Sequence, residues 1–204
     1  MAIVSEFDGF IFDYGGVLAF QQTEEDQAAM AAIVKLPREK FAELYWADRE
    51  EYDKGSVSGT EYWENIGRAA GVKLNASQIQ DLTDRDSESW MKYDPVMWDW
   101  IAELRRAGKK VGMLSNMPAD LGLALRSQTD RLSVFDQVTL SFDLGVVKPE
   151  PAIYEQCLEG LGTAPDRTLF LDDRIANVQG AEVLGMRAIQ FLDRDDVLLR
   201  VRGE

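Results

Sequence analysis

Residues 9–16 read GFIFDYGG, a short run of bulky apolar side chains that ends in Asp13 and is followed by two glycines. Apolar runs of this length, bounded by turn-forming residues, are typical of strands that are buried on both faces of a sheet. We therefore predict a first strand at Gly9–Asp13. Its last residue, Asp13, would then stand at one edge of the sheet.

Four more apolar runs follow in the second half of the chain: Lys109–Asn116, Asp136–Phe142, Thr168–Asp173 and Arg187–Leu192. Segments with helical spacing of apolar residues alternate with them, and each ends beside a glycine: Val96–Ala107, Pro151–Leu161 and Ile175–Leu184. Strands that alternate with helices predict an α/β fold with a doubly wound parallel sheet, which is a Rossmann-like core with helices on both faces.

The segment between the first and the second strand has a different pattern. It contains four helical stretches, with glycine breaks between them, at Glu24–Val34, Arg38–Tyr52, Thr60–Ala70 and Ser77–Trp90. We therefore predict a small helical cap at residues 20–92, inserted after strand one. The α/β core would then consist of residues 1–19 and 93–204.

The composition excludes several classes of function. The chain has 22 basic and 36 acidic residues and a net charge of −14, which disfavours binding to nucleic acid or to an anionic membrane. The N-terminus has no basic segment and no long apolar one, so we expect neither a signal peptide nor a membrane span. A single cysteine, Cys157, fits a cytoplasmic location. The sequence carries no indication of the oligomeric state.

Histidine is absent from the chain. This absence excludes catalysis by Ser–His–Asp or Cys–His groups and zinc sites built from imidazoles. The chemistry must therefore come from carboxylates, lysine, hydroxyl groups, the backbone or a hard metal ion.

Polar residues follow four of the predicted strands. Asp13 ends the first strand, Ser115-Asn116 ends the second, Lys148-Pro149 follows the third, and Asp172-Asp173 ends the fourth. Each of them alone has an ordinary explanation as a turn or helix-cap residue. Because ligands of such sheets bind at the carboxyl ends of the strands, the four together predict one polar site.

This order of motifs resembles the haloacid dehalogenase-like hydrolase superfamily over essentially the whole chain. The likeness extends to bacterial α-glucose-1-phosphate phosphatases and to the phosphatase domain of soluble epoxide hydrolase. The phrases that carry it are FDYGGVL (12–18), LSN (114–116), DLGVVKPEPAIY (143–154) and LFLDDRIANVQGAEVLGM (169–186). These phrases are specific in combination and weak one at a time.

The resemblance implies a phosphatase in which Asp13 attacks phosphorus and forms an aspartyl-phosphate. It also implies Mg²⁺ as the cofactor, because the oxygen ligands that it supplies suit that ion: Asp13, the backbone carbonyl of Gly15, Asp173 and the adjacent Asp172. The catalytic set is then Asp13, Gly15, Ser115 and Lys148. The substrate phosphate would be bound by Ser115, Asn116, Lys148 and, one helical turn past Asp173, Asn177.

One position departs from the pattern of the family. Most of its phosphatases carry a second Asp two residues after the nucleophile, which protonates the leaving oxygen, and here that residue is Gly15. Help of this kind is typically worth ~10²–10⁴-fold in rate. If the leaving oxygen departs without a general acid, anomeric sugar phosphates and aryl phosphates should be the preferred substrates. A cap residue such as Asp53, or a water held by Asn177, could instead supply the proton.

The interpretation that we favour is a Mg²⁺-dependent hydrolase of small phosphorylated metabolites, sugar phosphates among them. The first alternative is a non-catalytic or regulatory protein of the same fold that lacks the general acid. A 2-haloacid dehalogenase is less favoured, since it needs no metal and leaves Asp172-Asp173 unexplained. We expect Arg49, Tyr52 and Asp53 of the cap to touch the substrate and most of the cap aromatic residues to form its core.

Overall fold

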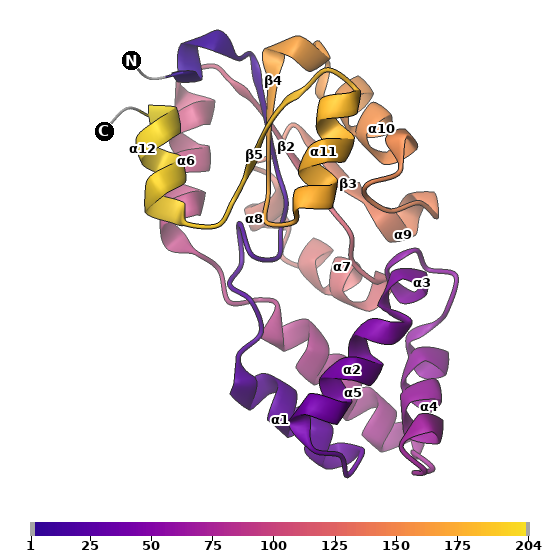
Figure 1. The fold of residues 1–204 in the computed structure, drawn as a ribbon. Helices are drawn as coiled ribbons and strands as arrows, with labels where there is room; N and C mark the ends of the chain where they lie inside the picture. Colours follow the sequence, from indigo (N-terminus) through magenta and orange to yellow (C-terminus); the bar gives the residue numbers. More distant parts are fainter. Residues whose placement is uncertain (1–2, 203–204) are drawn as a thin grey trace.

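The computed structural model describes residues 3–202, and a sheet of five parallel strands lies at its centre (Figure 1). The strands are β1 (Gly9–Phe12), β2 (Lys110–Ser115), β3 (Gln137–Leu140), β4 (Thr168–Asp172) and β5 (Arg187–Gln190). They lie in the order β3-β2-β1-β4-β5, so Asp13 leaves the sheet in the middle of its carboxyl edge. The predicted doubly wound α/β fold is confirmed.

Helices cover both faces of this sheet (Figure 1). Phe10 and Phe12 of β1 belong to an apolar cluster with α6 (Pro95–Arg106) and α12 (Arg194–Arg202). Ile11, between them, belongs to the cluster on the other face, with α10 (Pro151–Leu161) and α11 (Ile175–Val183). Because successive side chains of a strand point to opposite faces, β1 is apolar throughout and wholly buried.

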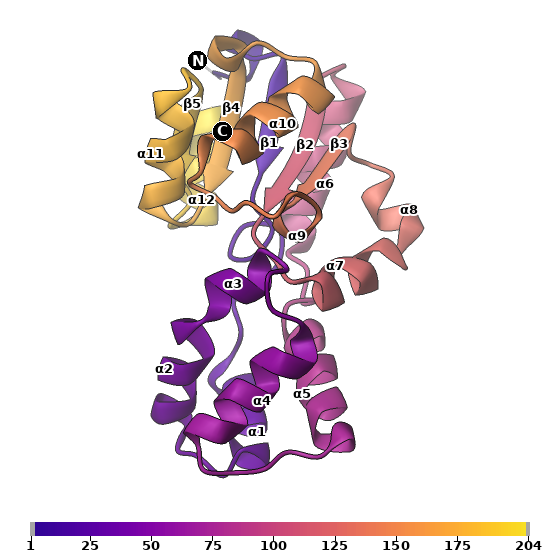
Figure 2. The ribbon, with the colours of Figure 1, turned by 90° about the vertical axis from the view of Figure 1, so that its right-hand side faces the viewer.

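Five helices occupy the chain between β1 and β2 and lie beyond the carboxyl edge of the sheet (Figure 2). They are α1 (Glu24–Ile33), α2 (Arg38–Ala47), α3 (Arg49–Asp53), α4 (Gly59–Ala69) and α5 (Ala76–Ser89). Their buried side chains form an apolar cluster of their own. The two connecting segments run side by side, since the backbone N–H of Phe20 donates to the carbonyl of Lys92 at 2.8 Å. We refer to α1–α5 as the cap; its boundaries at residues 20 and 92 stay a prediction.

Two predicted elements differ in the structure. The helix expected at 38–52 divides at Asp48, where the backbone leaves the helical region, and α3 turns toward the core. The strand expected at 136–142 ends at Leu140, and Ser141–Leu144 forms the short helix α9. Both differences place cap and core residues in contact, because Ser141 donates to the backbone carbonyl of Asp53. Tertiary contacts of this kind override local periodicity.

Short elements complete the chain. The 3₁₀ helices η1 (Ile3–Glu6) and η2 (Pro165–Arg167) precede β1 and β4, and α7 (Ala119–Arg126) and α8 (Thr129–Leu132) connect β2 to β3. Among the described residues, no helix combines the length and the apolar character that crossing a membrane requires.

Candidate active site

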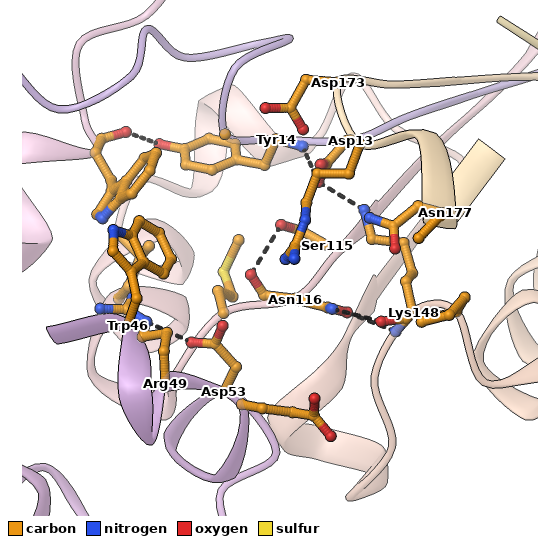
Figure 3. Close-up of a pocket in the computed structure, with 18 of the residues that line it drawn as sticks. Asp13, Tyr14, Trp46, Arg49, Asp53, Ser115, Asn116, Lys148, Asp173 and Asn177 are labelled. Carbon is orange, nitrogen blue, oxygen red and sulfur yellow. Dashed lines mark hydrogen bonds and ion pairs between the residues drawn. The ribbon is translucent and has the colours of Figure 1, made fainter. Parts of the chain in front are cut away.

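A cavity of about 610 Å³ lies at the carboxyl edge of the sheet, between the core and the cap (Figure 3). The core lines it with residues that the sequence predicted: Asp13, Gly15, Ser115, Asn116, Lys148, Asp173 and Asn177. Asp172 lies behind this wall and is fully buried. The tertiary structure therefore brings together the site residues that were predicted at the carboxyl edge of the sheet.

Asp13 is held where β1 ends. Its backbone N–H donates to the carbonyl of Leu171 at 2.9 Å, which continues the pairing of β1 with β4 by one residue. The N–H of Tyr14 donates to Oδ1 of Asp13 at 2.7 Å. Only 7% of Asp13 is exposed, and this exposed part borders the cavity.

Lys148 connects the two acidic strand ends. Its Nζ lies 2.8 Å from Oδ1 of Asp13 and donates to Oδ2 of Asp172 at 2.6 Å. A third bond, 2.9 Å long, goes to the carbonyl of Leu114 at the end of β2. Burial acts to lower the pKa of Lys148, but the two carboxylates raise it above its usual value, so the amine remains an ammonium ion.

Asp172 accepts hydrogen bonds from within the protein at both of its carboxylate oxygens. Besides Lys148, it accepts the backbone N–H of Arg174 at 2.8 Å and the side-chain amide of Asn177, which lies 3.0 Å from both carboxylate oxygens. The Asn177 amide is thus directed at Asp172, although its side chain also borders the cavity. Contacts of this kind fix the positions of Lys148 and of the first turn of α11.

Asp173 has fewer partners and borders the cavity directly. Its Oδ2 accepts the side-chain amide of Gln21 at 2.8 Å. A Cβ on Gly16, whose φ is +77°, would lie 2.7 Å from that oxygen, so only glycine allows the loop to approach so closely. The second glycine of GFIFDYGG therefore leaves space for Asp173.

The three carboxylates form a site that suits a divalent cation. One oxygen each from Asp13, Asp172 and Asp173 lies within 4.8 Å of the others. Burial, together with Asp172 and Asp173, raises the pKa of Asp13 to about 8, although Lys148 opposes this. One ammonium ion cannot stabilise three ionised carboxyl groups so close together, which is why Asp13 holds its proton in the absence of metal. A divalent cation would favour the ionised form of all three, and their hard oxygen atoms are the ligands that Mg²⁺ prefers.

Ser115 and Asn116 follow β2 and border the cavity from the side of the sheet. The Asn116 amide binds the backbone of Lys148 in both directions: it donates to the carbonyl at 3.0 Å and accepts from the N–H at 2.8 Å. Asn116 therefore holds the lysine loop against β2. Within the described part of the chain, the Ser115 hydroxyl makes only a long contact of 3.5 Å, to the carbonyl of Asn116, and remains available to a ligand.

The cap closes the cavity with Trp46, Arg49, Glu50, Asp53 and Trp90. Arg49 and Asp53 thus lie where the sequence placed them. Tyr52 does not: it is 2% exposed, stacks on Tyr62 at 4.3 Å and donates to Asp120 on α7. Its ring is part of the cap core, and its hydroxyl joins cap to core.

Several contributors to the cavity were missed in the sequence, among them Trp90, Gln21 and Tyr14. The Tyr14 hydroxyl donates to the carbonyl of Trp90 at 2.8 Å, and the indole N–H of Trp90 donates to Tyr45 at 3.2 Å. Trp90 is only 8% exposed in the structure. In the sequence it has the same spacing from other apolar residues as a side chain buried in the cap core. No sequence pattern indicates that one face of its ring borders the cavity.

The comparisons with known proteins agree with this geometry. The sequence model of the haloacid dehalogenase-like hydrolases matches residues 7–185, which is most of the chain. The chain belongs to this family. The parallel sheet described above is thus that of a haloacid dehalogenase-like hydrolase.

Relatives of this haloacid dehalogenase-like hydrolase include several phosphatases. A sesquiterpene phosphatase of Aspergillus oryzae is 27% identical over 188 residues, with 92% of this chain and 91% of that protein covered. A phosphatase of Mycobacterium tuberculosis is 29% identical, with 87% and 84% covered. An (S)-2-haloacid dehalogenase of Burkholderia cepacia is 25% identical, with 93% and 84% covered.

Solved structures share the fold. An enzyme of the same family from Bacteroides thetaiotaomicron, crystallised with magnesium and inorganic phosphate, superposes with a TM-score of 0.74. It is 21% identical, with 94% of this chain and 98% of that chain covered. Taken together, the comparisons support a phosphatase of this family.

Proposed function

We propose that this protein hydrolyses small phosphate monoesters, sugar phosphates among them, with Asp13 as the nucleophile and Mg²⁺ as the cofactor. The observation that carries the proposal is the contact of 2.8 Å between the buried carboxylate of Asp13 and Lys148, at the floor of a cavity lined by acidic groups. Named phosphatases among the relatives support the same class of reaction.

In the proposed reaction an oxygen of Asp13 attacks phosphorus and displaces the alcohol. Oδ1 is held by Lys148 and the N–H of Tyr14, so the carboxylate cannot rotate away from the cavity. Fixing a nucleophile in this way removes an entropic part of the barrier. Lys148 and the Ser115 hydroxyl would bind the phosphoryl oxygens, where an ammonium ion and a hydroxyl offset the charge of the phosphate.

The proposed ligands of Mg²⁺ are Asp13, the backbone carbonyl of Gly15 and Asp173, and the ion would neutralise phosphate charge next to the nucleophile. Asp172 contributes charge nearby, but its oxygens are already bound by Lys148, Asn177 and the N–H of Arg174. We therefore assign Asp172 and Asn177 to the positioning of Lys148 and of α11. Asn116 has the same role for the loop of Lys148.

A dehalogenase fits the site less well. A haloacid carries a carboxylate, and its binding beside Asp13, Asp172 and Asp173 would bring together four negative charges against Lys148. When a phosphate binds together with Mg²⁺, the cation compensates the excess negative charge. The dehalogenase relative shows that similar sequences include enzymes of another activity, so the choice of substrate must be argued from the residues of the site.

The test is a panel of phosphorylated metabolites, assayed with Mg²⁺ and with a chelator, together with 2-haloacids. We expect phosphate release from part of the panel in the presence of Mg²⁺ and no release of halide. Halide release without metal, and no phosphate release, would show that the protein is a dehalogenase. Inactivity on both would favour the non-catalytic alternative.

Lys148→Ala is expected to raise KM and to lower kcat, because the ammonium ion offsets phosphate charge both in the bound substrate and in the transition state. The loss in kcat/KM should be about 10²-fold or more, as for removal of one charge-stabilising donor. Lys110→Ala is the matched control, since Lys110 is exposed and pairs with Asp136 at the other end of β2. Wild-type kinetics of Lys148→Ala would restrict the lysine to a structural role.

A further inference from the structure

The position of the missing acid is crowded by Trp90. A Cβ added to Gly15 would lie 3.0 Å from Cζ3 and 3.3 Å from Cε3 of Trp90, so a larger side chain there would require the indole ring to shift. Trp90 cannot easily move, because Tyr14 binds its carbonyl and Tyr45 accepts its indole N–H. Any proton donor for the leaving group must therefore come from another wall of the cavity.

The cap side of the cavity carries two carboxylic side chains, Glu50 and Asp53. Glu50 is largely exposed and pairs with Lys54 at 2.9 Å, so Asp53 is the better candidate for a proton donor. Asp53, the last residue of α3, borders the cavity from the cap side, and Asp13 borders it from the core (Figure 3). The Asp53 side chain is 13% exposed. Its Oδ1 accepts Nε of Arg49 at 2.8 Å, and among the described residues Oδ2 has no hydrogen-bond partner. One carboxyl oxygen is thus held while the other is available to a substrate.

Three consecutive residues fix α3 to the core. Tyr52 donates to Asp120 on α7 at 2.8 Å, the carbonyl of Asp53 accepts the Ser141 hydroxyl, and Lys54 lies 3.3 Å from Glu150. The Ser141 hydroxyl, fully buried, also accepts the N–H of Met117 at 2.9 Å, directly after Ser115-Asn116. The Ser141 hydroxyl therefore fixes the position of Asp53 relative to Ser115 and Asn116, the proposed phosphate-binding side of the cavity.

The surroundings of Asp53 favour its protonated form. Among the residues that the structure describes, Arg49 is the one cation in direct contact with Asp53, and Arg49 also binds the buried Asp86 at 3.0 Å. Two buried carboxylates thus share one guanidinium. Burial, together with a smaller effect of Asp86 on α5, raises the pKa of Asp53 to about 6, although Arg49 on α3 and Arg174 at the start of α11 act to lower it.

We infer that Asp53 is the general acid that protonates the leaving oxygen, in place of the acid that Gly15 lacks. The inference rests on the proposed phosphatase function. As Asp13 forms its bond to phosphorus, the bond between phosphorus and the leaving oxygen breaks, and that oxygen takes both the electron pair and the proton of Asp53. In the second half of the reaction, a water molecule attacks the phosphorus of the aspartyl-phosphate, and the Asp53 carboxylate accepts a proton from that water. Inorganic phosphate leaves, and Asp13 and the protonated Asp53 are regenerated.

The test is a series of phosphate esters with graded leaving-group pKa, assayed with Mg²⁺ on wild type and Asp53→Asn. For a primary alkyl phosphate we expect kcat/KM of Asp53→Asn to fall by ~10²–10⁴-fold. For 4-nitrophenyl phosphate, whose leaving group needs no proton, the fall should be no more than several-fold. The dependence of kcat/KM on leaving-group pKa is then shallow in wild type and steep in the variant.

Asp48→Asn is the matched control, because Asp48 lies one turn before Asp53, is exposed and has no capping hydrogen bond. It should behave as wild type. Equal slopes in wild type and Asp53→Asn, or an equal loss on every ester, would overturn the inference. Inactivity of wild type on all esters would instead refute the phosphatase itself. If the amide does not fold, Asp53→Ser serves the same purpose, since it keeps a polar group beside Arg49.

The pH dependence separates an acid from a merely structural residue. The ratio of kcat/KM for wild type to that for Asp53→Asn, on an alkyl phosphate, should be largest at acid pH and decline as pH rises through about 6, where Asp53 loses its proton. Titration of the substrate is common to both proteins and cancels in the ratio. A ratio that does not vary with pH contradicts proton donation by Asp53.

Discussion

Asp13→Asn is expected to abolish turnover while the protein remains folded. The substitution keeps the size of the side chain and its contact with the N–H of Tyr14, but it removes the nucleophilic oxygen. Loss of a catalytic nucleophile lowers kcat on the order of 10⁶-fold. The measurements are steady-state hydrolysis of a substrate found in the panel, and mass spectrometry of acid-quenched protein, where only wild type should carry a phosphoryl group on Asp13.

The stability of this variant provides an internal check. Because the pKa of Asp13 is raised to about 8 in the folded protein, its ionised form opposes folding as pH rises from about 4 to 8. Asn cannot ionise, so metal-free Asp13→Asn should be no less stable than wild type at pH 7. Asp8→Asn, at an exposed ion pair with Arg167 just before β1, is the matched control and should keep full activity. Ordinary turnover by Asp13→Asn would refute the covalent mechanism.

Removal of divalent metal is expected to abolish hydrolysis, and addition of Mg²⁺ to restore it. Three carboxylates lie within 4.8 Å of one another where the phosphate must bind, and Lys148 balances only one charge. Without a cation, a phosphate dianion would meet uncompensated negative charge. Hydrolysis before and after treatment with a chelator, followed by titration with Mg²⁺, measures the effect.

Thermal unfolding reports metal binding independently of activity. Mg²⁺ should raise Tm of wild type in a concentration-dependent manner, because it binds the folded state alone. The shift should disappear in Asp173→Asn and remain in Asp166→Asn, where the altered carboxylate is exposed on η2. Full turnover in excess chelator would contradict the metal assignment and favour a dehalogenase.

The leaving-group series decides between two expectations. The glycine at position 15, considered in the sequence alone, predicts unassisted departure and a preference for anomeric and aryl phosphates. With Asp53 in the cavity, the structure predicts assisted departure and a wider range of alcohols. The same measurement therefore tests whether the cap contributes to the chemistry or only to the choice of substrate.

The sequence by itself determined the architecture and the chemical groups. Each strand is an apolar run with a polar residue at its end, so Asp13, Ser115 and Asp172-Asp173 could be placed at one edge of the sheet from local periodicity. The glycine that replaces the second Asp was equally visible. The absence of histidine by itself restricts the chemistry to carboxylates, lysine, hydroxyl groups, the backbone and a hard metal ion.

Only the tertiary structure decided which of these groups are free to act. Asn116 and Asn177 looked like ligands of phosphate, but their amides bind Lys148 and Asp172. Trp90 looked like a core residue, and Asp53 like one of three cap candidates for substrate contact and one of two conditional sources of the missing proton. Helical periodicity identifies the buried side of a helix and does not distinguish burial in the cap core from burial against a cavity. That distinction depends on contacts between segments distant in the chain, such as Ser141 with Asp53 and Trp90 with Gly15.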